Sequence, residues 1–166
     1  MEAQRAVEAC GLIDEALQYE SSWQRAEQNR ALFGEGVGYY GTSVGAIRAS
    51  LRDNLRRFPD LSHDEITALS SLLWAVEVYE RRLAAVILLQ THLYVLVVSD
   101  LSRLEGFLRS SAVDELARVL ARDVISPLLG GLGDRDRVRA ESVTARWAES
   151  EDARLRHAAE VATFDS

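Results

Sequence analysis

Apolar residues recur every three or four positions along most of this 166-residue chain, beginning with Val7, Cys10, Ile13 and Leu17. That spacing places them on one face of an α-helix, and such a face is stable only when another element covers it. No segment convincingly shows the strict alternation of apolar and polar residues that indicates a half-buried β-strand. The sequence therefore predicts an all-α fold.

The pattern divides into successive helical segments separated by short breaks. The expected helices contain residues 7–17, 23–33, 44–58, 62–73, 79–94, 101–108, 113–129, 137–149 and 151–164. The β-branched run 95–98 continues the helical pattern, so we do not assign it to a strand. A chain of this length suits one domain, which we place at residues 1–166.

Local signals mark several helix ends. Ser62 and Glu65 form the S-x-x-E pattern of a capping box at the start of one helix. Thr42 or Ser43 is placed to cap the helix before it, and Pro59 ends that helix.

Residues 34–41 form a glycine-rich loop that formally contains G-x-G-x-x-G at Gly36, Gly38 and Gly41. A dinucleotide site needs a strand before this motif and a βαβ unit around it, and the sequence predicts neither. We therefore interpret the loop as a flexible connector.

A short internal repeat links two parts of the chain that lie 73 residues apart. Trp74 precedes Arg81 by seven residues, Trp147 precedes Arg154 by seven, and paired alanines follow both arginines. The offset equals about two units of the ~40-residue HEAT period. Such repeats stack helix pairs into a curved solenoid. The sequence therefore predicts a HEAT-like α–α superhelix.

Composition and residue usage exclude several functional classes. The net charge of −7 does not attract nucleic acid in bulk, so DNA binding requires a local basic surface. Cys10 is the only cysteine and is expected in the core, while His63, His92 and His157 are too widely separated to predict a metal site. We expect His92 to be a hydrogen-bonded core residue. The apolar stretch 83–98 is too short and too interrupted to span a bilayer, so we expect a cytoplasmic protein without metal or cofactor.

Arginine occupies all 19 of the lysine-or-arginine positions, and several arginines share a helix face or a helix start. The clusters are Arg48, Arg52 and Arg56; Arg118 and Arg122; and Arg154, Arg156 and His157. On the inner surface of a solenoid, such residues can follow the phosphates of DNA. The alternative is that they are solvated residues that serve solubility and pairing along each helix.

Three stretches of the chain are similar to one known family in order and spacing. Residues 39–48 resemble the start of its solenoid, with Gly45 where proline is usual. Residues 73–85 resemble one of its helix pairs, and residues 146–159 resemble a later tryptophan-containing segment. Over about residues 20–164, the chain thus resembles the bacterial DNA alkylation repair family, the HEAT-like alkylpurine DNA glycosylases.

The resemblance implies hydrolysis of the N-glycosidic bond of cationic N3- or N7-alkylated purines, without a metal or cofactor. An aspartate would stabilise the developing oxocarbenium ion, and the positive charge of the lesion would make it a good leaving group. Asp114 looks like the aspartate of the family's V-D motif, with Ser110 at the position of its tryptophan. A gap-free count back from Ser126 and Pro127 instead puts Arg118 at the aspartate position and Asp114 at the tryptophan position.

In the last matching segment, Arg154 stands where the family has tryptophan, and His157 where it has arginine. The resemblance also implies later helices that would lie beyond residue 166. We assign Asp114 as the candidate catalytic carboxylate. The candidate DNA-binding residues are Arg48, Arg52, Arg118, Arg122, Arg154, Arg156 and His157.

Two hypotheses follow. In the first, the chain is a DNA alkylation repair-like protein that binds duplex DNA in a concave, arginine-lined groove and excises alkylated purines. In the second, it is a catalytically inactive HEAT-like module whose groove binds a protein partner. The acidic balance and the replaced tryptophans favour the second hypothesis. The ordered motifs and clustered arginines favour the first. We prefer it for family membership and DNA binding, and the sequence leaves excision open.

Overall fold

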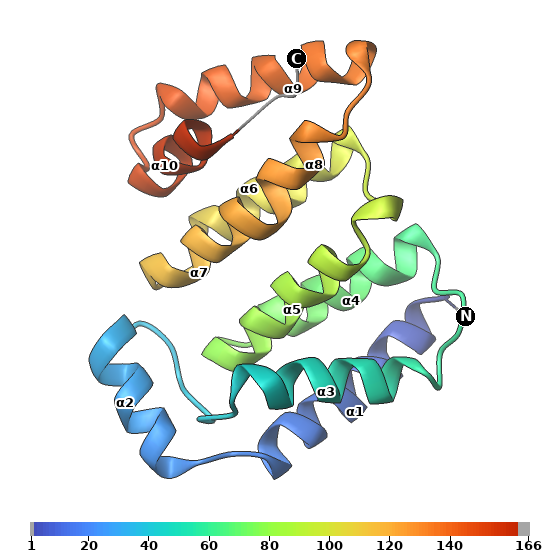
Figure 1. The fold of residues 1–166 in the computed structure, drawn as a ribbon, viewed down its shortest axis with the longest axis vertical. Helices are drawn as coiled ribbons and strands as arrows, with labels where there is room; N and C mark the ends of the chain where they lie inside the picture. Colours follow the sequence, from blue (N-terminus) through green and yellow to red (C-terminus); the bar gives the residue numbers. More distant parts are fainter. Residues whose placement is uncertain (1, 163–166) are drawn as a thin grey trace. The chain divides into compact units, whose positions relative to one another are not determined.

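The computed structural model describes residues 2–162, and the chain divides into two compact units, Met1–His92 and Leu93–Ser166 (Figure 1). Within the described residues, the only β-type pairing is an isolated parallel bridge between Gly38 and Val78, and helices dominate. The predicted all-α fold is confirmed. The single domain and the HEAT-like superhelix depend on how the two units are arranged, and they stay predictions. Between residues 2 and 162, no helix is both long enough and apolar enough to cross a membrane.

The first unit is a packed group of helices. Its α-helices are α1 (Glu2–Tyr19), α2 (Trp23–Phe33), α3 (Val44–Leu55), α4 (His63–Ala75) and α5 (Tyr79–Thr91). α4 packs against α1 and α5, and α3 also packs against both α1 and α5. Ile13 and Leu17 are buried in α1 as expected, whereas Val7 is exposed because the buried face passes through Ala6 and Ala9.

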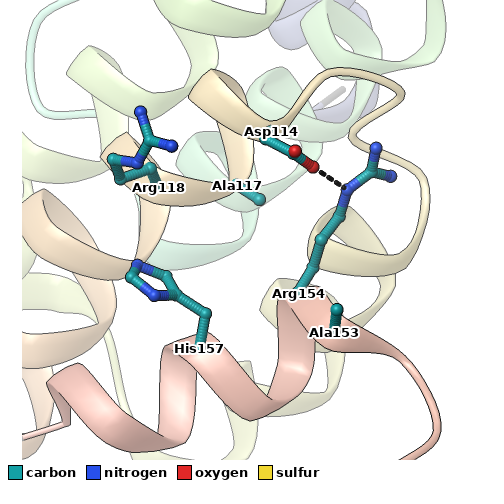
Figure 2. Close-up of a pocket in the computed structure, with 6 residues that line it drawn as sticks. All are labelled: Asp114, Ala117, Arg118, Ala153, Arg154 and His157. Carbon is teal, nitrogen blue, oxygen red and sulfur yellow. Dashed lines mark hydrogen bonds and ion pairs between the residues drawn. The ribbon is translucent and has the colours of Figure 1, made fainter.

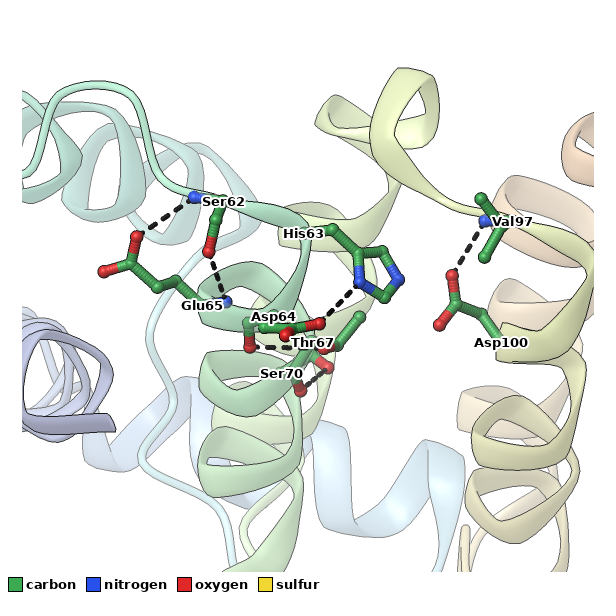
Figure 3. Close-up of polar contacts among 8 residues, drawn as sticks. All are labelled: Ser62, His63, Asp64, Glu65, Thr67, Ser70, Val97 and Asp100. Atoms are coloured by element: carbon green, nitrogen blue, oxygen red, sulfur yellow. Dashed lines mark hydrogen bonds and ion pairs between the residues drawn. The ribbon is translucent and has the colours of Figure 1, made fainter. Parts of the chain in front are cut away.

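Serine caps begin two of these helices as the sequence predicts. The hydroxyl of Ser62 accepts from the Glu65 N–H, and Glu65 Oε1 accepts from the Ser62 N–H, both at 3.1 Å (Figure 3). This reciprocal pair confirms the capping box at the start of α4. Ser43 caps α3. Thr42 does not, because its hydroxyl donates to the Leu17 carbonyl at 2.6 Å.

The glycine-rich loop between α2 and α3 is held by hydrogen bonds to the start of α5. The interpretation of this loop as a flexible connector is therefore wrong. The Tyr79 N–H donates to the Gly38 carbonyl at 2.9 Å. The buried carboxylate of Glu80 accepts from the N–H groups of Tyr40 at 2.8 Å and Gly41 at 3.2 Å. Burial raises the pKa of the Glu80 carboxyl, and these N–H groups offset part of that increase. The loop therefore supplies the hydrogen bonds that a buried acid requires.

Two adjacent arginines at the start of α5 reach back to the end of α4. The Arg81 guanidinium donates to a backbone carbonyl of α4 at 2.8 Å and lies 3.1 Å from Asp14. It also lies 3.4 Å from the sulfur of Cys10, which is buried as expected. Arg82 Nε donates to the carbonyl of Trp74 at 2.9 Å. The last carbonyls of a helix have no N–H partner within the helix. These two arginines supply that partner at the end of α4.

The helix predicted to reach residue 94 ends at Thr91. His92 follows it, with Nδ1 2.8 Å from the Leu88 carbonyl. His92 is hydrogen-bonded as expected, but it is only half-buried and does not belong to the core.

The second unit begins with two 3₁₀ turns, Leu93–Val95 and Val98–Asp100. The run 95–98 therefore does not continue a helix. The Asp100 carboxylate accepts from the Val97 N–H at 2.8 Å (Figure 3). Valine loses side-chain freedom in a helix, and the aspartate offers the backbone a non-helical partner, so both effects favour the turn.

The α-helices of the second unit are α6 (Leu101–Arg109), α7 (Asp114–Leu120), α8 (Ser126–Gly130), α9 (Asp134–Ala148) and α10 (Ala153–Val161). α10 packs against α9, α7 and α6, which places its first turns beside α7. The sequence predicted a last helix as far as residue 164. Residues 163 and 164 lie outside the described part of the chain.

A π-helical segment, Ala121–Ile125, joins α7 to α8, so the helix predicted for residues 113–129 is interrupted rather than regular. Pro127 provides the reason. Proline has no N–H for the carbonyl of Asp123, and its ring crowds that carbonyl. The wider π turn immediately before Pro127 relieves this conflict.

Glu105 links α6 to the end of α9. Its carboxylate accepts from the indole N–H of Trp147 and from Arg146 at 3.2 Å. Trp147 is only 1% exposed, so this hydrogen bond satisfies a deeply buried donor. Burial alone would raise the pKa of Glu105, but the hydrogen bonds from Trp147 and Arg146 outweigh it and lower the pKa below 4.5.

This shift predicts that Glu105 makes the fold sensitive to acid. A carboxyl whose pKa is lower in the folded state stabilises the fold above its unfolded pKa, and this contribution is lost as the pH falls through its folded pKa. Urea unfolding of the wild type should therefore show stability falling below about pH 4.5. Glu105→Gln should flatten that dependence, whereas Glu149→Gln, an exposed control in the same unit, should leave it unchanged. Equal pH dependence in Glu105→Gln and the wild type would contradict this prediction.

Candidate functional site

A pocket of ≈ 190 Å³ lies in the second unit between α7 and α10 (Figure 2). Its lining consists of Asp114, Ala117 and Arg118 from α7, and Ala153, Arg154 and His157 from α10. Four of these six residues are candidates from the sequence. The structure therefore brings together, in one pocket, residues that lie about 40 positions apart in the chain.

Helical geometry explains why these side chains share the pocket. Asp114 and Arg118 are four residues apart on α7, and Arg154 and His157 are three apart on α10, so each pair lies on one helix face. Leu155 and Ala158, each one position later, bury an adjacent face of α10. Asp152 begins α10 by accepting from the Arg154 N–H at 2.8 Å, which fixes where the first turn starts.

The central polar contact of the pocket joins its two helices. Arg154 Nε donates to Asp114 Oδ1 at 3.2 Å, as the dashed line in Figure 2 shows. The Asp114 side chain is 80% exposed, and the Arg154 side chain is 26% exposed. Asp114 therefore lies at the exposed rim of the pocket, and the Arg154 side chain is the more buried of the two.

Two further basic side chains line the pocket. Arg118 forms an ion pair with Glu115, three residues earlier on α7, at 2.8 Å. Across the described residues, His157 has no hydrogen bond or ion pair. With one carboxylate, two arginines and a histidine in its lining, the pocket suits a small anionic group such as a phosphate.

The structure does not bring Arg122 and Arg156 into this pocket. Arg122 makes a two-pronged contact with Asp123 at 2.7 and 3.0 Å. Arg156 donates to the Ser150 carbonyl at 2.7 Å and lines a separate hollow between α9 and α10. Neighbouring residues on a helix point in directions about 100° apart, so Arg156 cannot share the face of His157.

Arg48 and Arg52 lie in the first unit, on a groove of ≈ 380 Å³ between α3 and α5. Arg56 lines the same groove, so the i, i+4, i+8 spacing in the sequence identified a continuous stripe. His92 lines it as well, which the sequence did not predict because the end of α5 was misplaced.

Sequence reasoning missed the small residues that make room in the α7–α10 pocket. Ala117 and Ala153 line it beside the charged side chains. Their positions three residues after Asp114 and one before Arg154 were visible in the sequence, but only the pairing of α7 with α10 gives them a role. As for metals, residues 2–162 contain no group of three or more His, Cys, Asp or Glu side chains arranged to hold an ion.

Comparison with known proteins supports the resemblance. The family model described as DNA alkylation repair enzyme matches residues 13–166, which is most of the chain. A search of curated proteins finds no match to the chain. The matched range includes both the α3–α5 groove and the α7–α10 pocket. The chain therefore belongs to the DNA alkylation repair enzyme family.

Proposed function

We propose that this protein binds duplex DNA that contains alkylated purines, with the α7–α10 pocket on the DNA backbone. The observation that carries the proposal is the gathering of Arg118, Arg154 and His157 in one pocket of a DNA alkylation repair family member. Arginine suits this role because its planar guanidinium binds phosphate through two parallel hydrogen bonds. Arg48 and Arg52 are proposed as further phosphate contacts from the first unit.

A second proposal concerns catalysis. Asp114 places an exposed carboxylate at the rim of the same pocket. A carboxylate beside a bound alkylpurine nucleotide would stabilise the positive charge that develops on the sugar as the N-glycosidic bond breaks. Because an alkylated purine is already cationic, it needs no protonation to leave. We therefore propose that Asp114 supports hydrolysis of that bond by water.

The test is base release from a duplex that contains N7-methylguanine, with binding to the same duplex followed across a salt series. Wild-type protein should release the base, and its affinity should fall as salt rises. Asp114→Asn should reduce release by at least about 100-fold, because it removes the stabilising charge while leaving a side chain of similar shape. Asp123→Asn, which removes a carboxylate outside the pocket, should keep wild-type release.

The outcomes separate the alternatives. Release that survives in Asp114→Asn contradicts the catalytic role of Asp114. Salt-sensitive binding without release by the wild type indicates a non-catalytic DNA-binding protein. Absence of both release and binding contradicts the proposed function and favours a protein-interaction module.

A further inference from the structure

The ion pair between Asp114 and Arg154 occupies the two side chains that the proposed function needs most. Arg154 would bind a phosphate, and Asp114 would face a cationic lesion, yet in this structure each is the partner of the other. Among the described residues, Asp114 is the only ionic partner of Arg154. We infer that Arg154 exchanges Asp114 for a DNA phosphate, so that binding of the backbone releases the catalytic carboxylate.

The geometry of the pair makes this exchange easy. The contact is a single hydrogen bond from Nε to Oδ1, at 3.2 Å, although a guanidinium and a carboxylate can form two in parallel. The aspartate is 80% exposed, so water and salt screen the attraction. Within the described residues, no second basic side chain pairs with Asp114. An exposed pair held by one contact is a weak competitor for an arginine.

A phosphate would be a stronger partner at this position. It offers Arg154 a bidentate contact, which the single aspartate contact does not provide. Arg118 and His157 line the same pocket and can donate to the remaining phosphate oxygens. Arg118 forms an ion pair with Glu115 at 2.8 Å, so without DNA it also has a carboxylate partner. The three donors together favour phosphate over Asp114.

The exchange would tie catalysis to DNA binding, and it rests on the proposed function. Without DNA, the Arg154 guanidinium partly neutralises the Asp114 carboxylate. When Arg154 binds a phosphate instead, its guanidinium no longer offsets the negative charge of Asp114, and that charge acts fully on the sugar of the lesion. Asp114 is thus both the group that acts on the lesion and the group that competes with the backbone for Arg154.

The inference predicts that removing the charge of Asp114 tightens DNA binding rather than weakening it. Affinity is measured by fluorescence anisotropy with a labelled, undamaged duplex at low salt, where no cleavage step contributes. Asp114→Asn should bind about two- to fivefold more tightly than the wild type, the factor that corresponds to losing an exposed ion pair. Its plot of log affinity against log salt should keep about the wild-type slope, because Arg154 contacts the phosphate in both proteins and only the cost of breaking the ion pair is removed.

Loss of any negative charge also reduces general repulsion of DNA, so two controls isolate the exchange. Asp123→Asn removes a charge from the same unit and frees Arg122, which lies outside the pocket. Its gain in affinity should be clearly smaller. In an Arg154→Gln background, Asp114→Asn should give no more than the Asp123→Asn gain. Circular dichroism of each variant checks that the helices are intact.

Each outcome decides something different. A gain that depends on Arg154 supports the exchange. A gain that persists in Arg154→Gln, or no gain at all, overturns the exchange while salt-sensitive binding by the wild type still supports the proposed function. Absence of binding by the wild type and by Asp114→Asn overturns both.

Discussion

Gly41→Ala should destabilise the first unit by about 3–4 kcal/mol, the sum of a left-handed backbone strain and a steric overlap. Gly41 has φ = +79°, a conformation that residues with a β-carbon adopt at a cost. A Cβ atom there would lie 1.9 Å from the Ser22 carbonyl oxygen and 2.7 Å from the Ala26 nitrogen. Both are backbone atoms, so no flexible side chain can move aside. The midpoint of urea unfolding measures the loss.

The hydrogen bonds at this point make relaxation costly. The Gly41 N–H donates to the buried Glu80 carboxylate, and its carbonyl accepts from Arg25 at 2.9 Å. A shift of the loop would break contacts that satisfy a buried acid. Gly11→Ala is the matched control, because Gly11 is exposed in the interior of α1 and a β-carbon added there would meet nothing within 4 Å. It should stabilise the unit by up to about 1 kcal/mol. Equal effects of the two substitutions would contradict the argument.

The same loop shows what the sequence could not predict. Helix positions followed from local signals: the Ser62–Glu65 capping box and the apolar spacing in α1 are properties of neighbouring residues. The conformation of residues 34–41 depends on hydrogen bonds to Glu80, which lies about 40 positions later in the chain. Glu80 can accept these hydrogen bonds only once α5 has packed. A glycine-rich segment has the same composition whether it is mobile or tied down by such contacts.

The candidate site was predictable to a similar degree. Shared helix faces follow from spacing, so Asp114 with Arg118 and Arg154 with His157 were predictable pairs. The contact between Arg154 and Asp114 depends on the packing of α10 against α7. Tertiary packing of this kind does not follow from residue spacing within a helix. Arg156 was grouped with its neighbours because it is close in sequence, although the helix turns it toward α9.

The internal repeat leads to the second large effect, a difference between two arginines in equivalent positions. Arg81 and Arg154 each follow a tryptophan by seven residues. The Arg81 side chain is 9% exposed and pairs with Asp14 at 3.1 Å, whereas the Arg154 side chain is 26% exposed and pairs with the solvated Asp114. Arg81→Met should cost about 3 kcal/mol, because it removes the only cation paired with Asp14 among the described residues and the donor to the last carbonyls of α4. Arg154→Met should cost less than about 1 kcal/mol.

Binding to duplex DNA should show the reverse order. Arg154→Met should weaken affinity and reduce the salt dependence by about one unit, since one phosphate contact is lost. Arg81→Met, measured where the protein remains folded, should keep wild-type affinity because its guanidinium, within residues 2–162, contacts its own unit. Urea unfolding and anisotropy on the same preparations make the comparison. A large stability loss in Arg154→Met, or a binding loss in folded Arg81→Met, would show that the repeat assigns both arginines the same role. The expected split means that burial, rather than position in the repeat, decides which arginine stabilises the helix pair and which remains available to a ligand.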